Sequence, residues 1–410
     1  MLEFLTIIYL FYAFIGFYFL FLYGLVYLKN KEQIFSCPKA IKNYSLSIVV
    51  PCYNEEKSIG GTIQALLNLN YPNLKKIIIV DDCSTDNSFN IIKEYAQKYS
   101  KIVLLKTPKN TGKAAGAKNY GAKFANTELI GFVDADSYPQ KDSVKNMIGF
   151  FQNKKVAAVT ASILVKEKDK FIERLQAVEY RIIAFTRKIL GFVGAIYVTP
   201  GPLAVYRKSY FDELGGFDEE NLTEDIELTW NLLSKGYRVE MSLPSKAYTV
   251  APNTLKAWYR QRIRWNVGGI QTILKYRKTF ARKGILGCFV LPFFVLSWTL
   301  GIFGAGILIY RGARRLLVHY LATKYSVAAQ TAVLTLREIN LAPNILLFFG
   351  TAFILLSLFY TLLALSYLKE KEFKKTNLFS VLAYSFVYVL AYPFILINSA
   401  YKYLKKKRSW

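Results

Sequence analysis

The sequence is poor in the residues that bind transition metals or form cross-links: it has one histidine, His319, and four cysteines. The cysteines are scattered and include no Cys-x-x-Cys pair, which argues against a disulfide framework and a zinc site and suits a reducing compartment. A single histidine excludes metal chemistry that needs several histidines, and it excludes a histidine base in the soluble part of the chain. Acid–base catalysis or metal binding must therefore depend on carboxylates.

Acidic residues are scarce as well, with 28 Asp and Glu against 54 Lys and Arg and a net charge of +26. Such a balance usually indicates a nucleic acid or an anionic surface as partner. No motif of a nucleic-acid-binding module is present. The long apolar segments point instead to a membrane, whose anionic lipids attract basic flanking residues. We therefore expect membrane lipid, and no nucleic acid, as a partner.

The first long apolar segment runs from Phe4 to Leu28 and is followed by Lys29 and Lys31. It exceeds the roughly 20 residues needed to cross a bilayer. A cleaved signal peptide is the alternative, but the segment lacks a basic start and a small-residue cleavage site. We predict a transmembrane helix within residues 1–30, and the basic residues after it predict that the next domain is cytoplasmic.

Three more apolar segments, 285–309, 344–368 and 378–397, predict a C-terminal bundle of about three spans over residues 284–410. The chain is therefore expected to be a multi-pass plasma-membrane protein. The basic stretch between Arg311 and Arg337 and the tail at 402–408 would then face the outside, against the positive-inside rule. An interfacial or re-entrant segment around 312–340 would remove this conflict, which the sequence leaves open.

Residues 45–254 show a different pattern, in which short apolar runs alternate with amphipathic stretches of 10–15 residues. This alternation predicts a mostly parallel α/β sheet. Strands are expected at 46–50, 76–80, 101–105, 129–133 and 156–160, and helices at 58–69 and 87–99. Ligands of such sheets bind at the carboxyl ends of the strands.

Polar residues follow the first two predicted strands, in the segments "VVPCYNEE" and "IIIVDDCSTDNS". The adjacent carboxylates Asp81 and Asp82 end the second strand. Helix capping by Asp82, Ser84 and Asp86 would explain part of this pattern. Two neighbouring polar strand ends fit recognition of a nucleoside base and ribose better.

Paired carboxylates also end the fourth predicted strand, in "LIGFVDADSYP". Asp134 and Asp136 are expected near one point, where like charges repel unless a cation neutralises them. Oxygen ligands without histidine or cysteine suit Mg²⁺ or Mn²⁺ held partly by substrate phosphates. The alternative is a turn with an aspartate cap.

The segment "TPKNTGKAAGAKNYGAK" reads as a glycine-containing loop that enters a helix. It is not a P-loop. A lysine at such a helix start can contact a diphosphate, and Lys113 is the favoured candidate. Lys118 and Lys123 are equally well explained by a solvated helix face.

The next helix starts at "TEDIELTW", with Thr223 expected as N-cap and Glu224 and Asp225 in the first turn. Pairing with the helix dipole would explain Glu224 or Glu227. A carboxylate here could instead act as the general base towards an acceptor hydroxyl. Upstream, "TPGPLAVYR" reads as a loop that enters a strand, where Gly201 permits close approach of a ligand.

The segment "LKAWYRQRIRWNVGGIQTILKY" (255–276) is helical, aromatic and basic, and it dominates a predicted unit over 255–283. An amphipathic helix at the membrane surface is the simplest interpretation. Gln261, Arg264 and Trp265 span just over one helical turn and can face one side together.

These pieces, in this order, resemble the family-2 inverting glycosyltransferases with a GT-A (Rossmann-like) fold. More narrowly, they resemble the membrane synthases of the β-linked polysaccharides cellulose, chitin, hyaluronan and poly-N-acetylglucosamine. The similarity rests on "PCYNEE", "VDDCSTDNS", "GKAAGAKN", "DADS", "GPLAVYRK", "TED" and "QRIRW". The first two are common to the whole family, whereas "TED" followed by Q-x-x-R-W indicates the membrane synthase branch. The "FxVTxK"-like gating segment of cellulose synthases is missing after Trp265.

The resemblance implies a fold, an activity and roles for residues. The chain would be a hexosyltransferase with a GT-A α/β domain between membrane-spanning α-helices. It would use Mg²⁺ or Mn²⁺ to move a sugar from a nucleotide sugar, most often a UDP-sugar, to a growing β-glycan, with possible translocation across the membrane. A single transfer to a glycolipid or polyprenyl-linked acceptor is the alternative. A transporter or scaffold is disfavoured because the spans are nearly free of charge.

The implied roles fall on residues already described. Asp225 would be the general base, with Glu224 beside it, and Asp136 would ligate the metal together with Asp134. Gly201, Pro202 and Trp265 would contact the acceptor. The donor would be bound by Pro51, Tyr53, Glu55, Asp81, Asp82, Lys113, Asp134, Gln261, Arg264 and Trp265.

Overall fold

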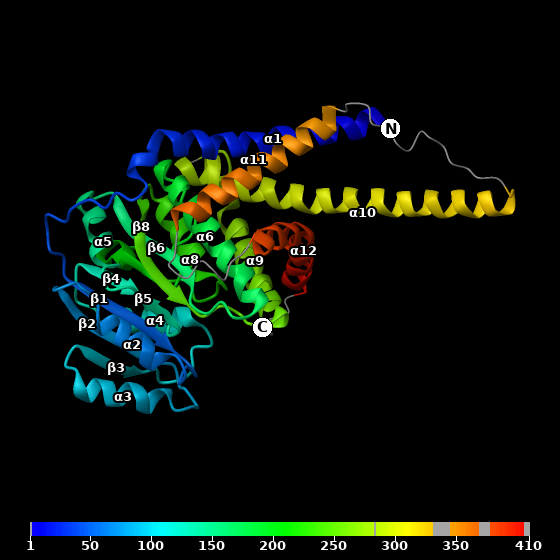
Figure 1. Ribbon diagram of the computed structural model, residues 1–410. Helices are drawn as coiled ribbons and strands as arrows, with labels where there is room; N and C mark the ends of the chain where they lie inside the picture. Colours follow the sequence, from blue (N-terminus) through cyan, green and yellow to red (C-terminus); the bar gives the residue numbers. More distant parts are fainter. Residues whose placement is uncertain (1, 283, 331–344, 369–377, 406–410) are drawn as a thin grey trace.

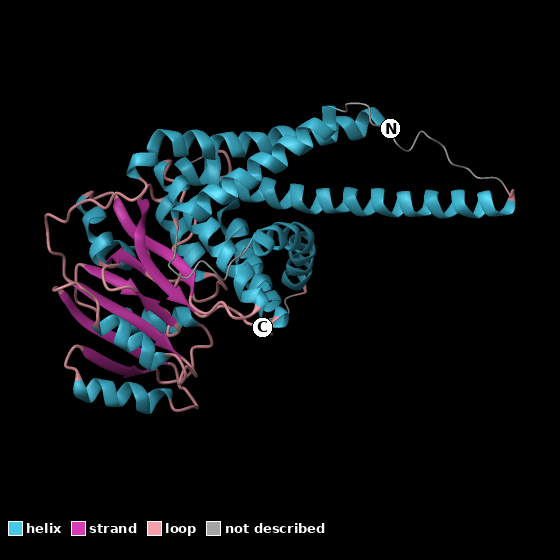
Figure 2. Ribbon diagram, in the orientation of Figure 1, coloured by secondary structure: helices cyan, strands magenta, loops and turns pink. Residues whose placement is uncertain are grey.

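The computed structural model describes residues 2–282, 284–330, 345–368 and 378–405. A domain built on one sheet lies beside a group of long helices, and helices α6 and α9 lie between the two parts (Figures 1 and 2). The predicted boundary residue at 283 and the basic residue Arg337 lie outside the described residues.

The first half of the sheet is parallel, as the sequence predicts. Its strands are β1 (Leu46–Cys52), β2 (Leu74–Asp81), β3 (Ile102–Lys106) and β4 (Leu129–Phe132). Alternate residues of β2 enter opposite cores: Ile77 and Ile79 pack on one face, and Ile78 and Val80 on the other. Both faces are covered, which explains why these strands are continuously apolar. The covering helices include α2 (Ile59–Leu67), α3 (Ser88–Lys98) and α4 (Ala114–Ala122).

The second half of the sheet is mixed, so the prediction of a mostly parallel sheet holds for only part of it. Its strands are β5 (Ser137–Pro139), β6 (Val156–Val165), β7 (Ala204–Arg207) and β8 (Arg238–Thr249). The full order is β3-β2-β1-β4-β7-β6-β8-β5, and β7 runs antiparallel to both of its neighbours. The sequence predicts a strand after Gly201, and β7 confirms it. Its antiparallel direction was not predicted, because strand direction is set by contacts between segments far apart in the sequence.

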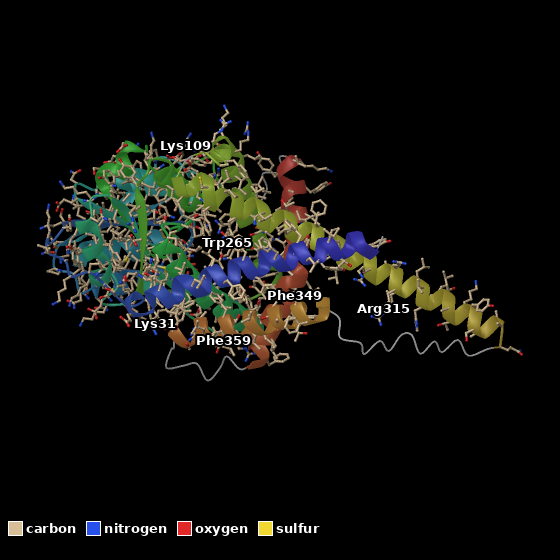
Figure 3. All side chains as sticks on the ribbon, turned by 90° about the horizontal axis from the view of Figure 1, so that it is seen from above. Lys31, Lys109, Trp265, Arg315, Phe349 and Phe359 are labelled. Carbon is tan, nitrogen blue, oxygen red and sulfur yellow. The ribbon has the colours of Figure 1, made fainter. Side chains whose placement is uncertain are left out.

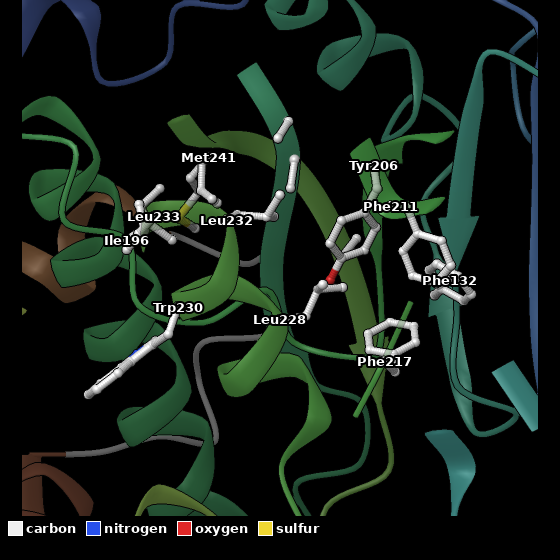
Figure 4. Close-up of a cluster of buried hydrophobic side chains, with 14 of the residues drawn as sticks. Phe132, Ile196, Tyr206, Phe211, Phe217, Leu228, Trp230, Leu232, Leu233 and Met241 are labelled. Atoms are coloured by element: carbon white, nitrogen blue, oxygen red, sulfur yellow. The ribbon is translucent and has the colours of Figure 1, made fainter. Parts of the chain in front are cut away.

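A cluster of aromatic residues fills the space beside β4 and β7. Phe132, Tyr206, Phe211 and Phe217 contact one another edge-on or tilted, with ring centroids 4.8–6.0 Å apart (Figure 4). Such arrangements are favoured over face-to-face stacking. The cluster packs α7 (Lys208–Glu213) and the following loop against the sheet, and this fixes the start of α8 (Glu224–Ser234).

Helix α6 (Phe171–Phe192) contacts the sheet on one side and long apolar helices on the other. Helix α9 (Leu255–Tyr276) has the bounds that the sequence predicts and packs on α8 and on the C-terminal helix. The remaining short elements are α5 (Lys145–Ile148), η1 (Lys31–Gln33), η2 (Gly149–Gln152), η3 (Arg277–Thr279) and η4 (Leu286–Val290).

Four helices in the described part of the chain are long and apolar enough to cross a membrane. They are α1 (Leu2–Asn30), α10 (Leu291–Ala328), α11 (Ile345–Tyr367) and α12 (Leu378–Leu404). Helices α1 and α11 lie side by side, and α12 packs on α6 and α9. The described residues of all four predicted spans therefore form helices almost throughout.

Helix α10 is longer than the sequence predicts, because it continues to Ala328 instead of ending near Ile309. The apolar run ends there, but the following residues are rich in Ala, Leu, Arg and Lys, which are good helix formers. Arg315 lies on the part of α10 that extends away from the rest of the molecule (Figure 3). Residues 312–328 thus belong to a continuous helix, and 331–344 lie outside the described residues.

Candidate active site

One cavity of about 640 Å³ gathers nearly all residues that the sequence singles out. It opens at the carboxyl ends of the parallel strands and continues to α9, α10 and α12. Only Asp81 among the predicted site residues is not part of its wall. The others line it: Pro51, Tyr53, Glu55, Asp82, Lys113, Asp134, Asp136, Gly201, Pro202, Glu224, Asp225, Gln261, Arg264 and Trp265.

The two carboxylates at the end of β2 differ in their surroundings. Asp82 accepts hydrogen bonds from the hydroxyl of Thr107 (2.7 Å) and from the hydroxyl (2.7 Å) and N–H of Thr111. Asp81 is fully buried, and its Oδ1 accepts from the N–H of Ser84 at 3.3 Å. Asp81 Oδ2 has no hydrogen-bond partner among the described residues. Asp82 therefore holds the loop before α4, and Asp81 keeps an unused acceptor behind the cavity wall.

That loop places Lys113 at the N-cap position of α4. Its ammonium donates to the carbonyl oxygen of Glu219 at 2.7 Å, which brings the loop before α4 against the acidic loop before α8. The lysine is half-buried in the cavity wall, and α4 presents its N-terminus beside it. This arrangement gives a positive pole for an anion.

Lys118 corrects the sequence interpretation, which allowed it to be a solvated lysine. Its side chain is 3% exposed and lies between two carboxylates, 2.9 Å from Glu224 and 3.2 Å from Asp134. Burial alone would lower the pKa of Lys118, but Asp134 and Glu224 outweigh burial and raise it. Lys123, by contrast, is exposed as expected. Lys118 thus links the strand end at Asp134 to the start of α8.

Asp136 and Asp134 meet in the cavity as predicted. Asp136 accepts hydrogen bonds from Ser137 (3.1 Å) and Thr249 (3.4 Å). Burial, with the nearby charges of Asp134 and Glu55, raises the pKa of Asp136 to about 7. This is the repulsion that a bound cation would relieve.

Asp134 and Asp136 are suited to bind a Mg²⁺-type ion that is shared with the substrate. They are not suited to form a closed metal site made of protein ligands alone. In the part of the chain that the structure describes, no group of three or more His, Cys, Asp and Glu is placed to hold a metal. Two carboxylates at a strand end would leave most ligand positions to phosphate and water, as Mg²⁺ often requires. The donor set therefore fits an ion that arrives with a nucleotide.

Glu224 and Asp225 begin α8 and have different electrostatic surroundings. Lys118, acting against burial, lowers the pKa of Glu224. Burial and the neighbouring charge of Glu224 raise the pKa of Asp225 well above its usual range. Thr223 occupies the N-cap position, but its side chain makes no capping bond and instead donates to Asn221. Of these two carboxylates, Asp225 is thus the one better suited to take up a proton near neutral pH.

Glu227, the other acid of this turn, has a structural role. It is buried and pairs with Lys275 (2.6 Å), and it accepts a hydrogen bond from Tyr276 (2.7 Å). These contacts tie α8 to the end of α9. They separate Glu227 from the cavity residues Glu224 and Asp225.

Gly201 approaches Asp134 more closely than any other residue type could. A Cβ atom added at Gly201 would lie 2.3 Å from Asp134 Oδ2. The close approach at Gly201 is therefore to a side chain of the protein, and close approach of a ligand there stays a prediction.

Helix α9 directs Gln261, Arg264 and Trp265 to the cavity, as its spacing predicts. The residue between them, Arg262, is fully buried and was not singled out by the sequence. It pairs with Glu179 of α6, and its guanidinium lies 4.0 Å from the centre of the Trp265 ring.

The same carboxylate reaches the C-terminal helix. Tyr388 of α12 donates to Glu179 at 2.7 Å and accepts from the indole N–H of Trp258 at 3.0 Å. A buried network therefore joins α6, α9 and α12 behind Trp265. Figure 3 shows Trp265 at the junction of the sheet domain and the long helices.

Five cations of the described residues are buried although the sequence does not mark them as buried: Lys118, Arg181, Arg187, Lys188 and Arg262. A signal was present for Lys118, since the small residues around it predict a helix packed tightly on the sheet, where a lysine cannot be solvated. No local signal marks Arg187 or Arg262, because their burial depends on helices far away in the sequence.

Comparison with known proteins agrees with this geometry. The model of the family "Glycosyl transferase family 2" matches residues 47–215. The chain is 32% identical over 251 residues to a poly-beta-1,6-N-acetyl-D-glucosamine synthase of Staphylococcus epidermidis, which is 60% of each chain. It is also 32% identical over 289 residues to the probable glycosyltransferase YdaM of Bacillus subtilis (strain 168), 67% of this chain and 66% of that one. The matched region thus spans about three fifths to two thirds of these relatives.

A solved structure shares the fold over nearly the whole chain. The mannosyltransferase PcManGT from Pyrobaculum calidifontis, in complex with GDP-Man and Mn²⁺, superposes with a TM-score of 0.61 at 19% identity. The superposition covers 97% of this chain and 99% of the other. It confirms the GT-A-like architecture with apolar helices at both ends.

Proposed function

Because residues 47–215 form a domain of glycosyl transferase family 2, we propose that the chain transfers a sugar from a nucleotide-sugar donor, a UDP-sugar, to a growing β-linked glycan. The observation that carries this proposal is the single cavity in which Asp225, Lys118 and Asp134 meet the Gln261, Arg264 and Trp265 face of α9. The similarity to the poly-beta-1,6-N-acetyl-D-glucosamine synthase of Staphylococcus epidermidis supports the β-glycan product.

The donor would lie across the carboxyl ends of β1, β2 and β4. Pro51, Tyr53, Glu55 and Asp82 line this space and would hold the nucleoside. Asp81 lies buried behind the wall, and its unused Oδ2 atom would accept a hydrogen bond from the nucleoside if the wall shifts on binding. The diphosphate would lie near Lys113 and the N-terminus of α4, with Gln261 and Arg264 opposite. All these groups except Asp81 face one space, which supports binding of one extended ligand.

Asp136 and Asp134 would hold Mg²⁺ or Mn²⁺ together with the donor diphosphate. The ion would supply electrostatic stabilisation of the leaving nucleoside diphosphate. The raised pKa of Asp136 supports this assignment, because it reflects burial of the carboxylate beside the negative charges of Asp134 and Glu55. Lys118 neutralises part of the same charge.

Asp225 would take the proton of an acceptor hydroxyl. The hydroxyl oxygen would attack the anomeric carbon from the side opposite the diphosphate, so that the new glycosidic bond forms as the bond to the diphosphate breaks, with inversion. Glu224 stays paired with Lys118, which leaves Asp225 as the free carboxylate of the turn. Gly201, Pro202 and Trp265 would line the acceptor side.

The four candidate spans support a membrane location. We place the sheet domain on the cytoplasmic side, where nucleotide sugars are available, because basic residues follow α1. The cavity continues to α10 and α12, so a product could pass directly from the site to the bilayer.

The decisive experiment supplies the purified full chain with a panel of labelled nucleotide sugars, with Mn²⁺ or Mg²⁺, and measures nucleotide release and product size. We expect release with a UDP-sugar and a ladder of glycans. Asp225→Asn should abolish transfer and leave donor binding within twofold of the wild type. No release with any donor, or normal transfer by Asp225→Asn, would refute the proposal or its base assignment.

A further inference from the structure

The inner end of the cavity forms a chamber unlike its donor side. It lies beyond Asp225, between α6, α8, α9 and the candidate membrane helices α10 and α12. Its wall is mostly apolar and aromatic and includes Ile183, Tyr197, Trp230, Ile273, Phe294, Trp298 and Tyr392. The carboxylate of Glu179 also lines the cavity, but it is paired with Arg262. This chamber, called the inner chamber below, is part of the same continuous space as the catalytic carboxylates.

One cation, Arg187 of α6, belongs to the wall of the inner chamber. Its residue surface is 5% exposed, and its Nε and Nη1 atoms have no hydrogen-bond partner among the described residues. No ion pair of the described part of the chain includes it. Burial lowers the pKa of Arg187, and Tyr197 and Asp225 act in the opposite direction.

The contrast with the other buried cations is informative. Arg262 forms an ion pair with Glu179, and Lys118 forms ion pairs with Glu224 and Asp134, although Nε and Nη1 of Arg262 have no hydrogen-bond partner among the described residues. A guanidinium that stays charged in an apolar wall is costly unless an anion accompanies it. Arg187 therefore presents unused donors to whatever enters the inner chamber.

We propose that the inner chamber binds a phosphate-bearing lipid as acceptor or primer, with Arg187 as the counter-ion of its phosphate. The inference rests on the proposed function, since it places this ligand next to the base Asp225. Aromatic walls alone would suit a neutral glycan, but a neutral glycan leaves Arg187 unpaired. An anionic sugar would pair with Arg187 but would gain little from Ile183, Ile273 and Phe294. A lipid phosphate would pair with Arg187 through its phosphate and contact the apolar wall through its alkyl chain. It would reach the inner chamber from the bilayer beside α10 and α12.

The test is a binding measurement on the full chain in an uncharged detergent, without turnover. Trp230, Trp265 and Trp298 line the cavity, so a brominated alkyl phosphate bound there should quench tryptophan fluorescence. The matched brominated alcohol and inorganic phosphate are the comparison ligands. We expect saturable quenching by the alkyl phosphate and at least tenfold weaker binding of the alcohol and of inorganic phosphate.

Variants then assign the site. Arg187→Gln should weaken alkyl phosphate binding at least tenfold, and Arg187→Lys should recover part of it. Arg277→Gln is the matched control, because Arg277 is an exposed arginine just after α9 and tests general attraction to basic surface. It should bind within twofold of the wild type. Retained nucleoside diphosphate binding by Arg187→Gln would show that the variant is folded.

Several results would overturn the inference. They are equal binding by Arg187→Gln, equal binding of the alcohol, displacement by inorganic phosphate or an anionic oligosaccharide at similar concentration, or a parallel loss of nucleotide binding. If no donor supports turnover but alkyl phosphate binding depends on Arg187, the proposed function fails and the lipid site stands.

Discussion

The ammonium group of Lys118 lies 2.9 Å from the carboxylate of Glu224, and this contact joins two helices that are 106 residues apart in the sequence. The same ammonium pairs with Asp134 at the end of β4. One buried cation thus sets the relative positions of the predicted metal-binding strand end and the predicted base. The relative positions of Asp134 and the start of α8 therefore depend on Lys118, a residue to which the sequence motifs assign no role.

Replacing Lys118 by Met should therefore damage both parts of the site. Two carboxylates would lose their partner, and the loss of one member of a buried ion pair costs about 3 kcal/mol or more. We expect a lower midpoint of thermal unfolding and a transfer rate reduced at least a hundredfold. Lys123→Met on the same segment is the control, since Lys123 is exposed. Similar behaviour of the two variants would contradict the assigned role.

The pH dependence of transfer should report Asp225. A base works only as the carboxylate, and burial and Glu224 raise the pKa of Asp225 towards neutral pH. The carboxylate fraction therefore falls as the pH is lowered, so kcat/KM should decrease from pH 8 to pH 6. Removing the charge of Glu224 favours the Asp225 carboxylate, and Glu224→Gln should move the inflection to lower pH.

The matched control for that profile is Glu220→Gln, because Glu220 is an exposed acid just before α8. Its profile should coincide with that of the wild type. If the inflection does not move in Glu224→Gln, the pH profile does not report the ionisation of Asp225.

Much of this architecture was predictable, because the relevant signals are local. The apolar strands, the α9 bounds and the carboxylates after β4 follow from periodicity and from residue types at strand ends. The antiparallel pairing of β7 and the burial of Lys118, Arg187 and Arg262 do not. They depend on contacts between segments far apart in the sequence. The sequence underestimates the length of α10, because the apolar run ends near Ile309 whereas the helix continues to Ala328.

The effect of Mn²⁺ on nucleoside diphosphate binding should depend on the carboxylate of Asp136. We expect Mn²⁺ to strengthen nucleoside diphosphate binding to the wild type and a chelator to reverse this. Asp136→Asn removes one of two carboxylate ligands, so the Mn²⁺ concentration for half-maximal effect should rise at least tenfold. Asp142→Asn, which changes an exposed aspartate nearby in the sequence, should leave it unchanged. Metal-independent nucleotide binding in the wild type would refute the metal assignment.

Gly201→Ala should displace Asp134 without unfolding the domain. The added Cβ would overlap Asp134 Oδ2, so either the carboxylate or the loop must move. We expect donor affinity to fall at least tenfold, measured by nucleotide-sugar binding, with a smaller effect on the thermal midpoint. Gly60→Ala provides the control, since its Cβ would make only ordinary contacts at 3.9 Å. Unchanged donor affinity in Gly201→Ala would show that the contact tolerates relaxation.

The last prediction concerns the network behind Trp265. Tyr388 links α12 to Glu179 and Trp258, and Glu179 in turn holds Arg262 against the Trp265 ring. Tyr388→Phe leaves Trp258 without this acceptor, a loss of about 1–3 kcal/mol for a buried donor. It should therefore lower the thermal midpoint.

If the network also positions Trp265 for the acceptor, Tyr388→Phe should raise the KM for the acceptor while donor binding stays within twofold. Tyr401→Phe on the same helix is the control, because Tyr401 is exposed and outside the network. If Tyr388→Phe lowers the thermal midpoint but leaves the acceptor KM unchanged, the network contributes to stability and does not position Trp265 for the acceptor. A shift in acceptor KM would make α12 part of the acceptor site, because a purely structural bond would lower stability without changing how the acceptor is held.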